Sequence, residues 1–358
     1  MHQRHLRVAR MIQKALYAAL ILIASTSIIM SLFSFHVAAS KHTLVVARGG
    51  VADFYTIQNA INAADPGDTI LVSSGTYYEN VKVNKTVSLI GENKMNTIID
   101  GNNAGETVWI QSDDVQISGF TLTHGSDYNI VIGGSWFAPE YFRVSGVIVK
   151  DNLVCNASWW GLVVGMDSKY NRIEGNIIQL NAGPGISLIA ASHNIITGNI
   201  IRNNNGGIYL AFSPDAIMDM TVPCRNNTIY DNTFIRDTIA AGSDSTEDSE
   251  NAWDNGAVGN YWSDYNGSDS DRDGIGDIPY VIDQYDADYC PLFNRPVRVY
   301  CDIDLNGKVD MKDVGLVASA SGSYAGNPRW RPHADINEDW RIDMQDVAAA
   351  VDCFGQCL

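Results

Sequence analysis

The chain has 358 residues, of which 46% are hydrophobic, and its formal net charge at pH 7 is −17. This length allows two or three domains, and the apolar fraction supports a sizeable core, which excludes a largely disordered protein. The negative charge repels nucleic acids and anionic membrane surfaces but attracts divalent cations where carboxylates cluster, so we expect no nucleic-acid partner.

Residues 1–40 form a candidate export signal. Four basic residues, the last of them Lys14, precede an uncharged apolar run from Ala15 to about Phe35. Because that run is long enough to span a bilayer, the segment is either a cleaved signal peptide or an N-terminal membrane anchor. Both alternatives place the rest of the chain in an extracellular or cell-surface location, with membrane contact only through an uncleaved segment.

A short helix is predicted near the start of the exported part. Residues 55–64 (YTIQNAINAA) have apolar positions at helical spacing, and DPGD at 65–68 ends the helix before a strand at 69–72. An uncovered end of a repetitive β-structure would expose unpaired backbone groups. We therefore expect this helix to cap such an end.

The centre of the chain repeats itself. NRIEGNII at 171–178 and NIITGNII at 194–201 are 23 residues apart, and NTIYDNTF at 227–234 is a further copy. Short strands at this period, with no helix between them, are typical of a parallel β-helix whose inward Ile, Leu and Val side chains form the core. We expect the asparagines to adopt left-handed backbone conformations at the corners and to hydrogen-bond from coil to coil.

Five segments resemble those of a known family: YTIQNAI at 55–61, PGDTILV at 66–72, GTYYEN at 75–80, SLIG at 88–91 and GNYWSDY at 259–265. They are similar to segments of pectin-lyase-like right-handed parallel β-helix proteins, and in particular of the NosD-type and sugar-hydrolase-associated β-helices. The resemblance covers about residues 43–295. It implies an all-β solenoid with a carbohydrate-related role, and we expect the β-helix over 41–251 and its C-terminal cap over 252–297.

Three activities associated with such folds lack their sequence signals. The chain shares GTYYE at 75–79 with pectinesterases, but the later catalytic segments of those enzymes have no counterpart in it. Glycoside hydrolysis needs two facing carboxyl groups, which the pair Asp113 and Asp114 alone does not supply. Copper binding needs clustered His, Met or Cys ligands, whereas the histidines of the exported part are scattered: His42, His124, His193 and His333.

The repeat is interrupted twice. Its spacing grows to 33 residues between Gly119 and Asn152 and again between Asn199 and Asn232. Both extra segments, at about 133–143 and 212–225, follow the glycine-opened strand, so we expect them to project from one side of the β-helix, three coils apart, with a groove between them.

Aromatic and polar side chains make this groove a candidate glycan site. The candidate ligand-binding residues are Trp136, Phe137, Tyr141, Lys169, Tyr170 and Phe212. If the groove is catalytic, as in a polysaccharide lyase or glycoside hydrolase, Asp167 or Asp215 with His193 would act as general acid or base. Arg143 or Arg225 would then hold a uronate carboxylate. The alternative is that these are packed loops bearing surface charges.

An acidic cluster follows in the expected cap. Carboxylates alternate with other residues and glycines allow a tight turn, which is the oxygen-rich arrangement that calcium prefers: Asp269, Asp271, Asp273 and Asp277. The alternative is a solvated acidic loop that closes the β-helix.

The last segment contains a duplicated calcium-loop pattern. Asp302-x-Asp304-x-Asn306-x-Lys308-x-Asp310-x-x-Asp313 recurs 33 residues later as Asp335-x-Asn337-x-Asp339-x-Arg341-x-Asp343-x-x-Asp346. Positions 1, 3, 5, 9 and 12 offer side-chain oxygens and position 7 offers a carbonyl, so each loop should hold one calcium ion. Trp340 replaces the usual glycine at position 6 of the second loop, which weakens the expectation for that loop.

Residues 298–358 resemble a type I-like dockerin, with aspartate at position 12 and a helix following each loop. The resemblance implies a cohesin-domain partner, recognised through loop positions 10 and 11: Met311, Lys312, Met344 and Gln345. It also suggests a disulfide from Cys301 to Cys353 or Cys357. A Cys353–Cys357 bridge and free thiols are the alternatives.

The sequence thus predicts an exported glycan-binding or glycan-processing β-helix, tethered through a calcium-dependent dockerin to a cohesin-bearing partner. The alternative function is a non-catalytic cell-surface structural or adhesion scaffold built from the same parts.

Overall fold

The computed structural model describes residues 41–134, 143–215, 220–246 and 249–294. In the C-terminal region it describes residues 301, 303, 309–324, 327, 329, 331, 334–336 and 341–354. The apolar N-terminal run lies outside these ranges. Within them, the helices are too short or too polar to cross a membrane.

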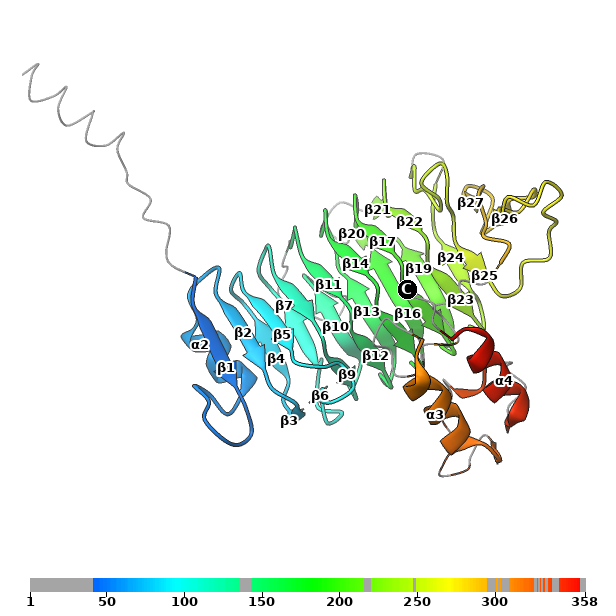
Figure 1. The fold of residues 1–358 in the computed structure, drawn as a ribbon. Coiled ribbons are helices and arrows are strands. Elements are labelled where there is room, and N and C mark those ends of the chain that lie inside the picture. The colour runs from blue at the N-terminus through cyan, green and yellow to red at the C-terminus, as the bar shows by residue number, and fades with distance from the viewer. Residues whose placement is uncertain are drawn as a thin grey trace, which may run out of the picture. The chain divides into compact units, whose positions relative to one another are not determined.

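Three parallel sheets build a right-handed β-helix, and each complete coil contributes one strand to each sheet (Figure 1). Sheet A contains β1 (Thr43–Val46), β2 (Thr69–Val72), β5 (Ser88–Gly91), β8 (Gln116–Ser118), β11 (Ile148–Lys150), β14 (Arg172–Glu174), β17 (Ile195–Thr197) and β22 (Thr228–Tyr230). Sheet B contains β3 (Gly75–Tyr78), β6 (Thr97–Asp100), β9 (Thr121–Thr123), β12 (Leu153–Cys155), β15 (Ile177–Gln179), β18 (Ile200–Arg202), β23 (Thr233–Ile235) and β25 (Tyr261–Trp262). Sheet C contains β4 (Val81–Val83), β7 (Val108–Ile110), β10 (Tyr128–Ile132), β13 (Trp160–Val164), β16 (Pro184–Ile189), β19 (Gly206–Ala211) and β24 (Ala241–Ser243).

Stacked aliphatic side chains form the core of the β-helix. One register position of sheet A is fully buried on five successive coils, where it is occupied by Ile117, Val149, Ile173, Ile196 and Ile229. A three-residue strand buries few side chains by itself, so each coil depends on its neighbours for stability. This arrangement confirms the fold class that the repeat predicts.

A ladder of buried asparagines runs parallel to the core. The Nδ2 atom of Asn176 donates to Oδ1 of Asn199 at 3.0 Å, and that of Asn199 donates to Oδ1 of Asn232 at 2.9 Å. Each Oδ1 also accepts the backbone N–H of the preceding ladder residue, for example Asn176 N to Asn199 Oδ1 at 2.9 Å. The predicted coil-to-coil hydrogen bonds are therefore present, and they satisfy amides that are at most 1% exposed.

The left-handed backbone conformation falls one residue earlier than predicted. Asp151 and Asp231, with φ of 53° and 54°, immediately precede the ladder residues Asn152 and Asn232. The preceding residue turns the corner, and the asparagine that follows directs its side chain into the interior. The ladder thus requires asparagine for its hydrogen bonds and not for its backbone freedom.

Helix α2 (Ile57–Ala63) confirms the predicted N-terminal helix and lies beside β1 at that end of the β-helix (Figure 1). Ile57 and Ile61 are fully buried against the first coils. The carboxylate of Glu79 accepts the N–H groups of Ile57 and Gln58, both at 3.0 Å. A negative charge at a helix N-terminus complements the helix dipole, so this bond also anchors the cap.

The C-terminal end of the β-helix is closed by aromatic residues. β26 (Tyr280–Val281) and β27 (Ala287–Asp288) form an antiparallel pair there. The ring of Trp262 is stacked between those of Phe234 and Tyr280, with centroid distances of 4.3 and 4.2 Å. The asparagine ladder ends in a carboxylate, because Asp288 Oδ2 accepts the backbone N–H of Asn260 at 2.6 Å.

The C-terminal region is a small helical module with its own apolar cluster. It contains α3 (Met311–Ala320), β28 (Ser323–Tyr324), β29 (Arg341–Ile342) and α4 (Met344–Asp352). A disulfide joins Cys301 to Cys353, which resolves the pairing that the sequence left open. Cys155, Cys224 and Cys290 have free thiols, and Cys357 lies outside the described residues.

Candidate functional site

Four consecutive turns between sheet C and sheet A carry most of the candidate groove residues that the structure describes. Parallel bridges run through Ser145, Lys169 and Ser192 to Arg225, so the turns are stacked in register. We call this surface the turn row, and its side chains are Arg143, Asp167, Lys169, Tyr170, His193 and Arg225. All six are exposed.

Side-chain contacts link neighbouring turns of the row. Arg143 Nη2 lies 3.1 Å from Asp167 Oδ2, and the rings of Tyr170 and His193 are 5.2 Å apart. Lys169 Nζ lies 5.7 Å from the centroid of the Tyr170 ring, within the range of a cation–π interaction. The structure therefore brings these candidate groove residues together on one surface.

The β-helix fold does not require aromatic rings at the two positions of the turn row that carry them, Tyr170 and His193. Tyr170 and His193 have φ of 59° and 57° and precede the ladder residues Asn171 and Asn194. The equivalent positions of the two flanking turns are occupied by Gly146 and Asn226, with φ of 74° and 52°, and either residue is better suited to positive φ than a bulky aromatic residue. Tyr170 is 57% exposed, so its ring is not held there by packing.

The two segments that interrupt the repeat follow strands β10 and β19 of sheet C, which are three coils apart. The second insertion includes an antiparallel hairpin of β20 (Ser213–Asp215) and β21 (Met220–Val222). Phe212, at its base, is 38% exposed. Trp136, Phe137, Tyr141 and the side chain of Asp215 lie outside the described residues.

The outer face of sheet C contains a buried cluster between these insertions. Val131 and Val163 share one register position, are at most 1% exposed, and cluster with Trp160 and Ile189. Ser187 shares the register position of Val163 and is fully buried as well, so these side chains are not accessible to a ligand. Among the described residues on this side, the adjoining turn row supplies exposed polar groups.

The acidic loop brings three of its four aspartates together. Carboxylate oxygens of Asp269, Asp271 and Asp273 lie within 4.8 Å of one another. Asp277 is engaged elsewhere, because its Oδ2 accepts hydrogen bonds from the side chain and backbone of Ser270 at 2.7 and 2.9 Å. These hydrogen bonds lower the pKa of Asp277. They also close the loop.

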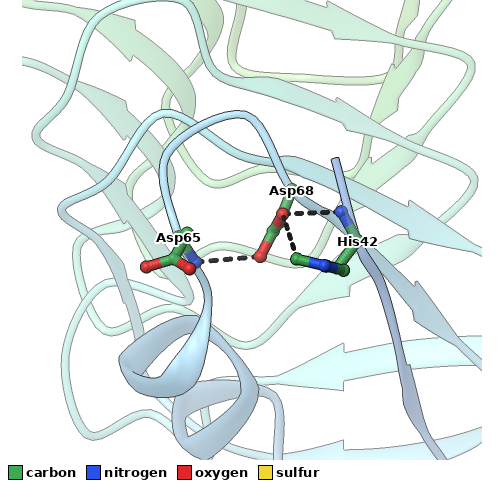
Figure 2. Close-up of side chains that lie close together, drawn as sticks. All are labelled: His42, Asp65 and Asp68. Atoms are coloured by element: carbon green, nitrogen blue, oxygen red, sulfur yellow. Dashed lines mark hydrogen bonds and ion pairs between the residues drawn. The ribbon is translucent and has the colours of Figure 1, made fainter. Parts of the chain in front are cut away.

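A further cluster, which the sequence did not single out, joins His42, Asp65 and Asp68 (Figure 2). Asp68 Oδ1 accepts the backbone N–H of His42 at 2.8 Å, and Oδ2 accepts that of Asp65 at 2.9 Å. These bonds lower the pKa of Asp68, so its carboxylate is fixed as a backbone acceptor. The pairing of β1 with β2 brings the three residues together. The spacing of motifs in the sequence does not show this register.

The two halves of the C-terminal module repeat one hydrogen-bond pattern. Asp313 Oδ1 accepts Ile303 N at 2.7 Å, and Asp346 Oδ1 accepts Ile336 N at 2.7 Å. Asp310 and Asp343 cap the helices α3 and α4. Of the remaining candidate calcium ligands, Asp335 and Arg341 are described, whereas Asp302, Asp304, Asn306, Lys308, Asn337 and Asp339 lie outside the described residues.

The candidate partner-binding residues occupy equivalent exposed positions in the first turns of the two helices. Met311 is 67% exposed and Met344 is 69% exposed. Lys312 and Gln345, which follow them, are exposed as well. The module therefore presents an exposed methionine followed by an exposed polar residue at equivalent positions of its two halves.

Comparison with known proteins identifies the family. The family described as "Periplasmic copper-binding protein (NosD)" matches residues 61–267, which is more than half of the chain. The chain belongs to this family of NosD-type right-handed parallel β-helices.

Two curated proteins are similar to parts of the chain. A cell surface glycoprotein of Methanothermus fervidus is 25% identical over 364 aligned residues, covering 73% of this chain and 60% of the glycoprotein. The probable ABC transporter binding protein NosD of Stutzerimonas stutzeri is 29% identical over 140 residues, 32% of each chain. The chain thus spans less than two thirds of the length of either relative.

Solved structures of carbohydrate-active enzymes are distant neighbours. Pectate lyase Pel9A has a TM-score of 0.44 and 14% identity, covering 62% of each chain. An alginate lyase from Paenibacillus sp. has a TM-score of 0.35 and 15% identity, covering 55% of this chain and 75% of the lyase.

The family description names copper, which prefers clustered imidazole, thiolate or thioether ligands. In the described ranges, two groups contain three or more His, Cys, Asp or Glu side chains that could hold a metal ion: the His42 cluster and the aspartates of the acidic loop. The first has one imidazole and a carboxylate that already accepts two backbone N–H groups, and the second has only carboxylates. Neither donor set fits copper.

Proposed function

We propose that this protein is an extracellular or cell-surface β-helix that binds an acidic polysaccharide along the turn row. The stacked, exposed side chains of four successive turns carry this proposal. The four turns span about 14 Å at about 4.8 Å per coil, a length suited to an extended polymer. The candidate export signal and the names of the relatives, a cell surface glycoprotein and a periplasmic family, support the location.

The charge of the turn row favours an acidic polymer. In a chain of net charge −17, the row combines Arg143, Lys169 and Arg225 with one carboxylate, Asp167. Guanidinium groups bind carboxylates by paired hydrogen bonds, and the exposed Tyr170 ring offers an apolar face to a sugar. Trp136, Phe137, Tyr141 and Phe212 would extend this surface along the two insertions.

Affinity electrophoresis in gels containing polygalacturonate, alginate or a neutral glucan tests the proposal. The wild-type protein should be retarded by an acidic polymer, and Tyr170→Ala and Arg225→Ala should each reduce the retardation severalfold. Tyr78→Ala, which removes another exposed tyrosine in the first coils, is the matched control. Equal retardation of all four proteins would contradict the proposal.

Catalysis is the further possibility at this site. Asp167, Asp215 and His193 are the candidate acid–base groups for a lyase or hydrolase, with Arg143 or Arg225 holding a uronate carboxylate. Release of oligosaccharides that disappears in Asp167→Asn and His193→Gln would establish an enzyme. Retardation without release would define a binding module. A scaffold or adhesion protein would show neither.

We further propose that residues 298–358 form a dockerin that attaches the β-helix to a cohesin-domain protein. The equivalent bonds of Asp313 and Asp346, on a 33-residue repeat, support this proposal. Each loop would hold one calcium ion, and Met311, Lys312, Met344 and Gln345 would contact the partner. A third ion would be held by Asp269, Asp271 and Asp273, with Asp277 closing the loop.

Calcium-dependent capture tests the attachment. The full chain should bind an immobilised type I cohesin domain in calcium and dissociate in EDTA. Calorimetric titration of the metal-stripped chain should give three bound ions, and Asp271→Asn should reduce that number by one. Binding to cohesin that is unaffected by EDTA would exclude the calcium-dependent dockerin.

A further inference from the structure

A polar cavity of about 410 Å³ lies in the C-terminal cap of the β-helix. Its walls are the segment 236–241, which leads from β23 to β24, together with residues 263–264 and 280–282 of the cap. The turn row lies on other turns, between sheets C and A, so the cavity is a separate site. Its size falls within the range of small-molecule pockets.

Packing makes one wall of the cavity rigid. Tyr280 is stacked on Trp262 with an interplanar angle of 4°, and Trp262 is 1% exposed. The hydroxyl group of Tyr280 donates to Asp264 Oδ2 at 3.1 Å. Burial raises the pKa of Tyr280, so the phenol keeps its proton at neutral pH and donates it to this hydrogen bond. One oxygen of Asp264 is thereby fixed, while its other oxygen has no hydrogen bond among those recorded for the described residues.

The segment 236–241 contributes a second carboxyl group to the cavity. Asp237 Oδ1 accepts the backbone N–H and the Nδ2 of Asn204 at 2.8 and 3.0 Å, which ends one asparagine ladder. Its Oδ2 is buried without a hydrogen-bond partner. Desolvation raises the pKa of Asp237 to about 7, so the group is in part protonated at neutral pH. Ser263 Oγ accepts the backbone N–H of Arg236 at 3.2 Å, which ties this wall to the cap.

We propose that this cavity binds a single neutral sugar unit. The fixed carboxylate of Asp264 and the hydroxyl groups of Ser263 and Thr238 match a ligand that presents adjacent hydroxyl groups, and Val281 and Ile282 provide a small apolar face. The cavity contains two carboxyl groups, of Asp237 and Asp264, and one guanidinium group, of Arg236. This excess of carboxyl groups disfavours the binding of a uronate, which carries a carboxylate of its own. The cavity therefore selects a different sugar from the turn row, and the inference does not depend on the proposed acidic polysaccharide.

Ligand-observed NMR on the full chain, with a panel of neutral hexoses and pentoses, galacturonate and glucosamine, tests this proposal. At least one neutral sugar should show saturation transfer from the wild-type protein. Val281→Trp should block the cavity and weaken binding at least tenfold. Val281 is 67% exposed, so this replacement spares the core. Val51→Trp, at a fully exposed position of the opposite end, is the matched control and should bind like the wild type.

Asp264→Asn provides the second test, because the amide oxygen can still accept from Tyr280 while the carboxylate is lost. It should also weaken the sugar at least tenfold. The proposal is overturned if no neutral sugar binds, if only galacturonate or glucosamine binds, or if both variants bind normally. Retardation by acidic polymers should be unchanged in Val281→Trp, so failure at this cavity is distinguishable from failure at the turn row.

Discussion

Asp313 and Asp346 make the same pair of backbone hydrogen bonds in the two halves of the C-terminal module. The Oδ1 atom of each carboxylate accepts an N–H ten residues upstream at 2.7 Å, and the Oδ2 atom accepts the N–H of the helix N-cap, at 2.9 Å from Asp310 and 2.8 Å from Asp343. Both aspartates are fully buried. Each one therefore connects the start of a loop to the start of the helix that follows it.

Replacing either aspartate should destabilise its half of the module. Asp313→Ala or Asp346→Ala leaves two N–H groups without an acceptor, at a cost of about 2–4 kcal/mol. Scanning calorimetry of the full chain should show a lower transition temperature for the module, and EDTA should lower that of the wild type. Gln345→Ala, on an exposed helical position, is the control and should change little. A wild-type transition that is insensitive to EDTA would contradict calcium binding in this module.

The Cys301–Cys353 disulfide should stabilise the same module. It closes a loop with a sequence separation of 52 residues, which corresponds to about 4 kcal/mol in the chain-entropy account. A Cys301→Ser, Cys353→Ser double variant should unfold the module at a lower temperature while the β-helix transition is unchanged. Cys290→Ser, which removes a free thiol, is the control. A module as stable in the double variant as in the wild type would show that the crosslink makes no net contribution.

The asparagine ladder should make a large contribution to β-helix stability. Asn199→Ala removes the acceptor of Asn176 and the donor to Ile173 O, and leaves buried groups unpaired. We expect a loss of about 2–4 kcal/mol in the free energy of unfolding, measured by urea denaturation. Asn205→Ala, at an exposed position one coil corner away, should cost less than about 0.5 kcal/mol. Similar losses of unfolding free energy for both variants would show that the ladder hydrogen bonds contribute no more to stability than an exposed asparagine does.

The repeat made the β-helix predictable because its period encodes the fold directly. Inward residues such as Ile173 and Ile196 recur at the 23-residue spacing, and the register of sheet A follows from it. The same period located both insertions after strands of sheet C and stacked the turn row. The period does not encode contacts between residues far apart in the sequence. The pairing of Cys301 with Cys353 and the grouping of the His42 cluster both follow from the three-dimensional fold.

The ends of the repeat were the least predictable parts. Asp237 and Asp288 continue the asparagine ladders with carboxyl groups, and only their burial distinguishes them from surface aspartates. The cavity beside Asp237 is built from three segments that are separate in the sequence: 236–241, 263–264 and 280–282. A local sequence pattern does not record such a juxtaposition, because it depends on how the cap folds back on the last coil.

Asp237 should make stability depend on pH. Its folded-state pKa of about 7 exceeds its usual value of 3.8, so the folded protein binds the proton more tightly than the unfolded chain. The contribution of Asp237 to stability is therefore favourable at low pH and is lost as pH rises from about 4 to about 7. Asp237→Asn should be more stable than the wild type at about pH 8, by about 1–3 kcal/mol, with a difference that vanishes near pH 4. Urea denaturation across this range measures it.

Asp151→Asn, at an exposed corner, is the control for that experiment. Its stability should follow that of the wild type across the range. A constant difference between Asp237→Asn and the wild type at all pH values would mean that the carboxyl group does not titrate in this window.

The Arg143–Asp167 ion pair should restrain polymer binding and contribute little to stability. Its side chains are 72% and 45% exposed, and exposed pairs of this kind contribute about 0–1 kcal/mol. Asp167→Asn removes the carboxylate that competes with the polymer for the Arg143 guanidinium. The affinity for polygalacturonate, measured by retardation, should therefore increase by about twofold to fivefold. The unfolding temperature should stay the same. Arg143→Gln should have the opposite effect on affinity, and both effects should diminish at high salt because exposed charges are screened. Weaker binding by Asp167→Asn would instead mean that the carboxylate contacts the polymer, and loss of product release with tighter binding would identify Asp167 as a catalytic group.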